Sequence, residues 1–218
     1  ALAFAITEEA VEDNLYDRIA SRYTKALARS MANAKQVKAA NVLNRGFNSS
    51  YTGGDGLELF STAHVIVSGT EQNELSTAAD LNETSLETAL IDINAFTDER
   101  GLRIAAKGVK MIVPSGNQFN AERILKSQGR TGTADNDLNA IFSMGMVPQG
   151  YRVNNFLTDA DSWYLITDVP NGMKMFQRTP LTTAMEGDFD TGNVRYKARE
   201  RYVFGVSDYR GIFGVQGA

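Results

Sequence analysis

The sequence predicts an α+β protein in which one very long helix comes first and mostly β structure follows. The first observation is the stretch from Thr7 to Arg45, which has helical apolar spacing and contains no proline or glycine. The second is a series of short apolar or alternating runs later in the chain, separated by turn residues. With 218 residues and 43% hydrophobic content, the chain can build a sizeable core in one domain or two small ones.

The first expected element is a single helix from Thr7 to Arg45. Thr7 is a suitable N-cap, the acidic residues that follow it favour the positive end of the helix dipole, and Gly46 is a natural stop. Such a helix would span roughly 55 Å. Helices of this length are typical of extended scaffolds, since the charges exclude a membrane span and a strict heptad is absent. One apolar stripe repeats every four residues: Val11, Leu15, Ile19, Tyr23, Leu27 and Met31.

The middle of the chain mixes turns with short elements. Residues 47–56 are turn-rich, 57–67 predict a strand or hairpin, and 68–82 predict a polar loop. A second helix is expected from Ser85 to Thr97, because apolar residues recur at helical spacing on one side. These are Leu86, Leu90, Ile93 and Phe96.

The remainder predicts short strands around one further helix. Val109–Val113 is an apolar strand ended by Pro114, and residues 117–127 predict a helix with Phe119, Ile124 and Leu125 on its apolar side. Residues 129–137 predict a polar loop. Five strands are expected after it: 140–147, 151–156, 163–167, 173–177 and 194–206.

Composition removes several classes of function. The formal net charge is -4, whereas a general nucleic-acid binder is usually basic. The sequence has no cysteine, which excludes disulfides, iron–sulfur clusters and cysteine nucleophiles. No apolar run approaches the length of a transmembrane helix.

His64 is the only histidine, so a Ser–His–Asp triad would have to use it. The sequence lacks the G-x-S-x-G nucleophile turn, and a histidine on a strand is usually structural. A zinc site would need carboxylates around one histidine, a rare ligand set. We therefore expect a protein that is not an enzyme, with no catalytic residues, no cofactor-binding residues and no metal ligands.

Other short motifs have simpler interpretations. Residues 188–192 are similar to part of a calcium loop but lack the later ligands, so a hairpin turn is favoured. Residues 129–132 lack the lysine of a phosphate-binding loop, and 53–56 lack dinucleotide-loop spacing. Asp159 and Asp161 form a carboxylate pair too common to indicate catalysis.

The segment from Arg195 to Tyr202 alternates basic residues with others, two of them aromatic. Such a strip suits contact with single-stranded nucleic acid. It suits a solvated face or a contact between subunits equally well, and the sequence leaves these alternatives open.

The order of elements resembles a known family, the major capsid proteins of tailed bacteriophages, and in particular Mu-like head subunits. The resemblance covers essentially the whole chain and rests on the spacing of several short stretches. These are the long helix from Ile6-Thr7-Glu8-Glu9 to Arg45-Gly46-Phe47, Asp55-Gly56-Leu57-Glu58-Leu59-Phe60-Ser61-Thr62-Ala63-His64, Lys110-Met111-Ile112-Val113-Pro114 with Ala121-Glu122-Arg123-Ile124-Leu125, Asn136-Asp137-Leu138-Asn139, Leu157-Thr158-Asp159-Ala160-Asp161-Ser162-Trp163-Tyr164-Leu165 and Gly205-Val206-Ser207-Asp208-Tyr209-Arg210-Gly211-Ile212-Phe213-Gly214.

The resemblance implies a Hong Kong 97-like capsid fold. A peripheral domain would comprise residues 1–60 and 178–206, with the spine helix 7–45 and a long strand. An axial domain would comprise residues 61–177 and 207–218. In the family an N-terminal arm and an extended loop precede the spine helix. Only Ala1 to Ile6 precede it here, so we expect that this chain is missing its natural front end, with the arm and the loop absent upstream.

The implied function is self-assembly, as hexamers and pentamers, into the icosahedral head shell around phage DNA. The chain itself would be the main partner, with portal, scaffolding and decoration or cement proteins as further ones. The DNA would be enclosed but not specifically bound, no membrane would be involved, and the location would be the virion after assembly in the host bacterial cytoplasm. The alternatives are an encapsulin-type nanocompartment shell with enzyme cargo and, more distantly, a soluble hydrolase using His64.

Overall fold

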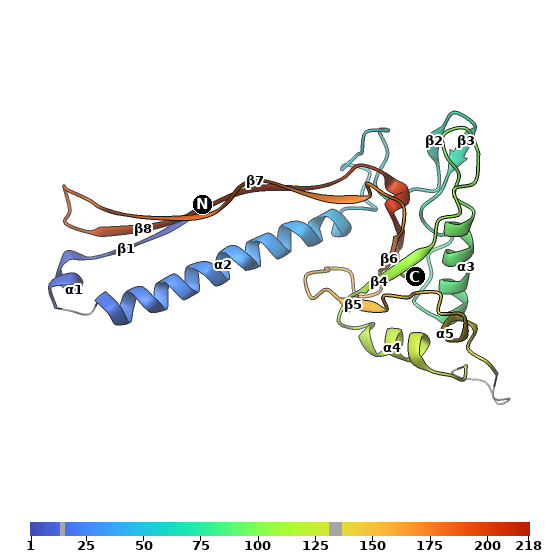
Figure 1. Cartoon of the computed structure of the whole chain (residues 1–218), viewed down its shortest axis with the longest axis horizontal. Coiled ribbons are helices and arrows are strands. Elements are labelled where there is room, and N and C mark those ends of the chain that lie inside the picture. Colours follow the sequence, from blue (N-terminus) through green and yellow to red (C-terminus); the bar gives the residue numbers. More distant parts are fainter. Residues whose placement is uncertain (14–15, 131–136) are drawn as a thin grey trace. The chain divides into compact units, whose positions relative to one another are not determined.

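The computed structural model describes residues 1–13, 16–130 and 137–218, and its chain divides into two units. The first unit contains Ala1–Ala39 and Met175–Phe204, and the second contains Ala40–Lys174 and Gly205–Ala218. The elements of both are drawn in Figure 1, and each unit is described by itself.

The first unit is built on a three-stranded sheet. Its strands are β1 (Leu2–Ile6), β8 (Val194–Val206) and β7 (Met173–Gly187), in that spatial order. β1 runs antiparallel to β8, with Leu2 opposite Ala198 and Ile6 opposite Val194. The long helix α2 (Tyr16–Asn44) runs along this sheet (Figure 1).

The long helix begins later than the sequence predicted. A separate turn of helix, α1 (Glu8–Glu12), starts at the predicted N-cap Thr7 but ends at Asp13. The expectation of one uninterrupted helix from Thr7 to Arg45 is therefore wrong at its start. Asp13, the C-cap of α1, contributes to the break, because a short polar side chain competes for backbone hydrogen bonds and disfavours helix interiors. Leu15 of the predicted stripe lies outside the described residues.

α2 is an exposed helix for most of its length. Among its side chains from residue 20 to 44, only Leu27, Ala40 and Leu43 are buried. Tyr23, predicted on the apolar stripe, is half exposed but lies against the ring of Phe4, with centroids 5.6 Å apart. A helix with one narrow buried side needs water or another molecule around the rest of its surface.

The second unit has a four-stranded sheet with the spatial order β5-β4-β6-β9. β4 pairs in parallel with β5, and the other two pairings are antiparallel. Met111, Val113, Trp163, Leu165 and Phe213 from this sheet are completely buried. The strands are β4 (Gly108–Val113), β5 (Tyr151–Val153), β6 (Trp163–Thr167) and β9 (Ile212–Val215).

Helix α3 (Glu83–Asn94) contributes the other half of this core, as predicted from its apolar spacing. All four residues of the predicted apolar side are buried. The helix begins two residues earlier than expected because Asn82 and Ser85 form a capping box, in which each side chain accepts the other's backbone N–H.

Several expectations for the shorter elements are wrong. Residues 140–147 form helix α5 (Ala140–Met144), not a strand, because Asn139 caps its start and Gly145 ends it with a φ of 61°. In α4 (Gln118–Lys126), Phe119 is 67% exposed, and Ala121 instead is buried beside Ile124. Of the strand or hairpin predicted over 57–67, only 64–66 is extended, as β2 (His64–Ile66). It does form a hairpin, but its partner β3 (Gly69–Glu71) lies in the predicted loop.

Candidate functional site

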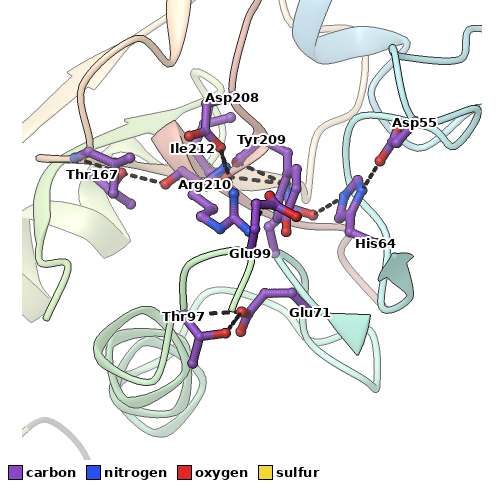
Figure 2. A network of polar contacts seen from close by, with 12 residues as sticks. Asp55, His64, Glu71, Thr97, Glu99, Thr167, Asp208, Tyr209, Arg210 and Ile212 are labelled. Atoms are coloured by element: carbon purple, nitrogen blue, oxygen red, sulfur yellow. Dashed lines mark hydrogen bonds and ion pairs between the residues drawn. The ribbon is translucent and has the colours of Figure 1, made fainter. Parts of the chain in front are cut away.

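His64, the one residue that could have carried acid–base chemistry, lies in a buried polar network of the second unit (Figure 2). Its side chain is 1% exposed, and both ring nitrogens have partners. Nδ1 lies 2.5 Å from Oδ2 of Asp55, and Nε2 lies 3.1 Å from Oδ1 of Asn73. The ring stacks on Tyr209, with centroids 3.9 Å apart and planes 10° apart.

Asn73 is the centre of this network. Its side-chain nitrogen donates to the backbone carbonyl oxygens of Leu59, Tyr209 and Ile212. Its side-chain oxygen accepts from the backbone N–H of Ser61 and faces His64. Asn73 is completely buried, so each of these polar groups needs a partner inside the protein. The side chain therefore fastens the loop before β2 to the C-terminal segment.

The same contacts fix the orientation of the Asn73 amide. Carbonyl oxygens can only accept, so the amide nitrogen must face them and the amide oxygen must face His64 and Ser61. On the other side of the imidazole ring, Nδ1 lies beside the carboxyl group of Asp55. Burial acts to raise the pKa of Asp55, but hydrogen bonds from His64 and from the Leu57 N–H outweigh it and lower that pKa. Both ring nitrogens of His64 are thus engaged in contacts inside the protein.

The C-terminal side of the network is held by Arg210. Its guanidinium lies 3.0 Å from Glu99 and 3.6 Å from Asp208, and it stacks over the ring of Tyr209 (Figure 2). Burial raises the pKa of Tyr209 to about 12, so its hydroxyl stays neutral at physiological pH. Thr167 in β6 donates to the carbonyl oxygen of Arg210 at 2.6 Å. Arg210 therefore joins the loop after α3, the central sheet and the chain end.

Close contacts with neighbouring atoms explain why several positions near this network are glycine. A Cβ on Gly46 would lie 2.4 Å from the ring of Phe60, and a Cβ on Gly214 would lie 2.6 Å from the same ring. Gly211 and Gly172 face each other so closely that a Cβ on either would meet the other's Cα. Gly46 was predicted as a helix stop; its main structural requirement is room for Phe60.

The other stretches that carry the family resemblance also have structural roles. Trp163 donates from its indole N–H to the carbonyl oxygen of Ala79 at 3.2 Å. The side-chain nitrogen of Asn139 donates to the carbonyl oxygens of Ile124 and Ser127. Asn136 of the same stretch lies outside the described residues. These polar side chains satisfy buried backbone groups, which is a packing function.

The remaining candidate motifs form turns. Asp188 accepts from Thr191 and Arg195, so residues 188–192 are the hairpin turn that was predicted. Asp159 accepts from the Asp161 backbone, and Asp55 of the glycine-rich turn accepts from the Leu57 backbone. Residues 131 and 132 of the phosphate-loop candidate lie outside the described residues. Within the described ranges, no three His, Asp or Glu side chains gather as metal ligands would.

The sequence did not reveal the partners of His64. Asp55 and His64 lie in one of the stretches that carry the family resemblance, but nothing in the sequence marks Asn73 or Tyr209 as their neighbours. The spacing of Asp55 and His64, nine residues across a glycine-rich turn, was the only available signal.

The basic segment of β8 separates into two faces. Ala198 is buried, Glu200 pairs with Lys35 of α2, and the ring of Tyr202 lies under Lys35 and Lys38, so these residues face α2. The alternate residues Arg195, Lys197, Arg199 and Arg201 are exposed and point to the other face.

None of the helices in the described ranges combines the length and hydropathy needed to cross a bilayer.

Comparison with known proteins identifies the family. The sequence matches the phage capsid protein family over residues 1–215. No curated protein matches it.

Among solved structures, the fold is similar to a chain of mycobacterium phage Che8, with a TM-score of 0.55 at 14% identity, covering 100% of this chain and 70% of that one. It is also similar to the capsid of Myoviridae phage XM1, with a TM-score of 0.56 at 16% identity, covering 100% and 72%. A virus-like particle from Pyrococcus furiosus gives a TM-score of 0.56 at 12% identity, covering 99% and 75%. The buried motif residues, the long helix and the match over nearly the whole sequence agree, and the chain belongs to the phage capsid protein family.

Proposed function

We propose that this chain is a major capsid subunit that assembles as hexamers and pentamers into an icosahedral head shell around phage DNA. The observation that carries the proposal is the family match over residues 1–215, together with the fold shared with phage capsids. A closed shell reuses the same surface patches under symmetry and needs contact area, not a catalytic pocket.

The surface of the first unit supports this role. β7 carries large exposed side chains, including Phe176, Leu181 and Met185 at 59%, 49% and 60% exposure. Exposed apolar side chains of this size on one element are typical of surfaces that meet other subunits. A one-layer sheet with one helix against it buries little by itself and gains stability from neighbours.

In the Hong Kong 97-like description, the first unit would be the core of the peripheral domain, with α2 as its spine. The second unit would contain the axial domain around its four-stranded sheet. The predicted domain limits, with residues 1–60 and 178–206 peripheral and residues 61–177 and 207–218 axial, stay part of this proposal. The function would be structural and not enzymatic.

The partners would be other copies of the chain, with portal, scaffolding and decoration or cement proteins at assembly. The DNA would be enclosed without specific binding, as suits a net charge of -4. Assembly would take place in the host bacterial cytoplasm.

A second candidate is an encapsulin-type nanocompartment shell, which would hold enzyme cargo in place of DNA. The similarity in fold to the virus-like particle from Pyrococcus furiosus favours keeping this alternative. The phage capsid family match favours the head shell.

Sedimentation of the purified protein tests whether it forms large particles. The ratio of nucleic-acid absorbance to protein absorbance tests whether these particles contain nucleic acid. We expect large closed particles, and particles from infected cells should contain nucleic acid. A particle with a protein cargo and no nucleic acid would favour the nanocompartment. A monomer or small oligomer under all salt and scaffolding conditions would contradict both.

A further inference from the structure

One face of the sheet in the first unit is left uncovered by the elements of that unit that the structure describes. α2 lies along the opposite face, where it meets Tyr202 and Glu200 of β8. The uncovered face presents Ala3 and Ala5 of β1 beside Lys197 and Arg195 of β8, because these residues are paired in register. The alanine side chains are short, so the longer basic side chains of β8 extend beyond them on this face.

Among the residues that the structure describes, three of the exposed basic residues of β8 have no ionic partner. Arg195 lies 2.5 Å from Asp188 in the adjacent turn, but no ion pair joins Lys197, Arg199 or Arg201 to any other residue that the structure describes. We call these three residues the basic strip. Alternate positions of a strand are about 6.8 Å apart, so the strip extends over roughly 14 Å along β8.

A partner for the strip must be acidic, and nucleic acid is one possibility. Binding of single-stranded nucleic acid usually needs aromatic rings on the same surface as the positive charges. Here Tyr196 stacks on Phe4 with centroids 5.3 Å apart, and Tyr202 lies under Lys35 and Lys38. Both rings are therefore on the face toward α2, away from the strip. Neither tyrosine of β8 therefore provides a stacking platform beside the strip.

The other end of the same unit carries the opposite charge. Glu9, Glu12 and Asp13 of α1 and its C-cap are exposed, and Asp190 is exposed in the β7–β8 turn. The two segments lie together, since a Cβ on Gly192 would meet the carboxylate of Glu8, and Figure 1 shows α1 beside this turn. We call Glu9, Glu12, Asp13 and Asp190 the acidic tip.

The acidic tip also displays an aromatic side chain. Phe189 is 101% exposed, at the turn held by the hydrogen bonds of Asp188. A large aromatic side chain on a fixed turn, surrounded by charge, has the composition of an interface anchor.

From this charge complementarity we propose that the basic strip of one copy binds the acidic tip of a neighbouring copy, with Phe189 as an apolar anchor between them. This inference rests on the proposed shell function and names one of its subunit contacts. The two patches lie on the same chain but at different places, so the contact is heterologous. Repeated around an axis, a heterologous contact closes a ring, as a capsomer requires.

Charge-reversal variants of the full chain test the contact. The strip variant is Lys197→Glu/Arg199→Glu/Arg201→Glu, and the tip variant is Glu9→Lys/Glu12→Lys/Asp190→Lys. A control matched to the strip variant, Arg22→Glu/Lys25→Glu/Arg29→Glu, makes the same change of net charge as that variant but on exposed positions of α2. Circular dichroism checks that each variant folds, and light scattering with sedimentation measures assembly.

We expect each of the first two variants to reduce assembly by at least about tenfold, because like charges then face each other across the contact. Combining the strip and tip changes in one chain should restore assembly. A 1:1 mixture of the two folded variants should associate where each alone does not, which shows that the contact joins two molecules. The α2 control should assemble as the wild type does.

Other results would overturn the inference. A folded strip variant that assembles normally removes the contact, and if it also loses bound nucleic acid, the strip is a nucleic-acid surface. If assembly is lost and the combined variant does not recover it, the acidic tip is not the partner. An equal loss of assembly in the α2 control leads to the same conclusion. These results leave the proposed shell function standing, whereas a wild-type chain that never associates would contradict both.

Discussion

Nε2 of His64 lies 3.1 Å from the side-chain oxygen of Asn73, and Nδ1 of the same buried ring faces Asp55. The stacked ring of Tyr209 covers one side of the imidazole. We therefore predict that His64→Ala lowers the free energy of unfolding by roughly 2–4 kcal/mol, through a cavity and the loss of two hydrogen bonds. Urea denaturation of the unassembled subunit measures this change.

Phe119→Ala is the matched control for that experiment, because Phe119 is 67% exposed and its loss leaves no cavity. We expect it to change stability by no more than about 0.5 kcal/mol. An equal effect of the two substitutions would show that His64 has no special structural role.

The lowered pKa of Asp55 predicts a pH-dependent contribution to stability. A carboxyl group whose folded pKa is below its unfolded value stabilises the protein above the unfolded pKa, and this contribution is lost as the pH falls through the folded pKa. Asp55→Asn should therefore cost about 1 kcal/mol at pH 6, and the difference from the wild type should shrink below about pH 4. Urea denaturation at a series of pH values measures it; a constant difference from pH 6 to pH 3 would contradict the assignment.

Gly214→Ala should destabilise the second unit by roughly 1–3 kcal/mol, because the new methyl group would overlap the ring of Phe60. Adding Phe60→Leu should make the combined cost smaller than the sum of the two single costs, since the smaller side chain gives room. Gly54→Ala is the control, as nothing lies within 4 Å of the position that its Cβ would take. Strictly additive costs would show that the two residues do not meet.

Substitutions at Ala26, an exposed position inside α2, test whether assembly needs an unbroken helix. Ala26→Pro should cost at least ~3 kcal/mol and Ala26→Gly about 1 kcal/mol. We expect the proline variant to stay soluble but to lose assembly, and the glycine variant to assemble more slowly. Light scattering with circular dichroism separates these effects. Normal shells from the proline variant would mean that α2 is not a structural spine.

The parts of the fold that the sequence predicted correctly depend on local pattern. The buried side of α3 follows from its spacing, and the limits of β6 and β8 were predicted as the structure has them. The failures occur where one residue overrides a pattern. Asn139 starts a helix in an apolar run that was predicted as a strand, and Asp13 ends α1 inside an otherwise helical stretch.

The network around His64 could not be predicted, because its contacts are distant in the sequence. Asn73 donates to the carbonyl oxygen of Tyr209, 136 residues away. The residue types alone allow many pairings, and only the packed sheet brings these two together. The sequence also could not show that the basic residues of β8 lie on the opposite face from its tyrosines, because this depends on which face of the strand packs against α2.

Electron cryo-microscopy of particles purified from phage-infected cells tests the central claim most directly. The account predicts a closed icosahedral shell whose hexamers and pentamers are built from this chain, with α2 continuous from Tyr16 to Asn44 in every subunit and the basic strip of each copy against the acidic tip of a neighbour. Particles whose shell density belongs to another chain, with this protein absent or present only as a small oligomer, would contradict it.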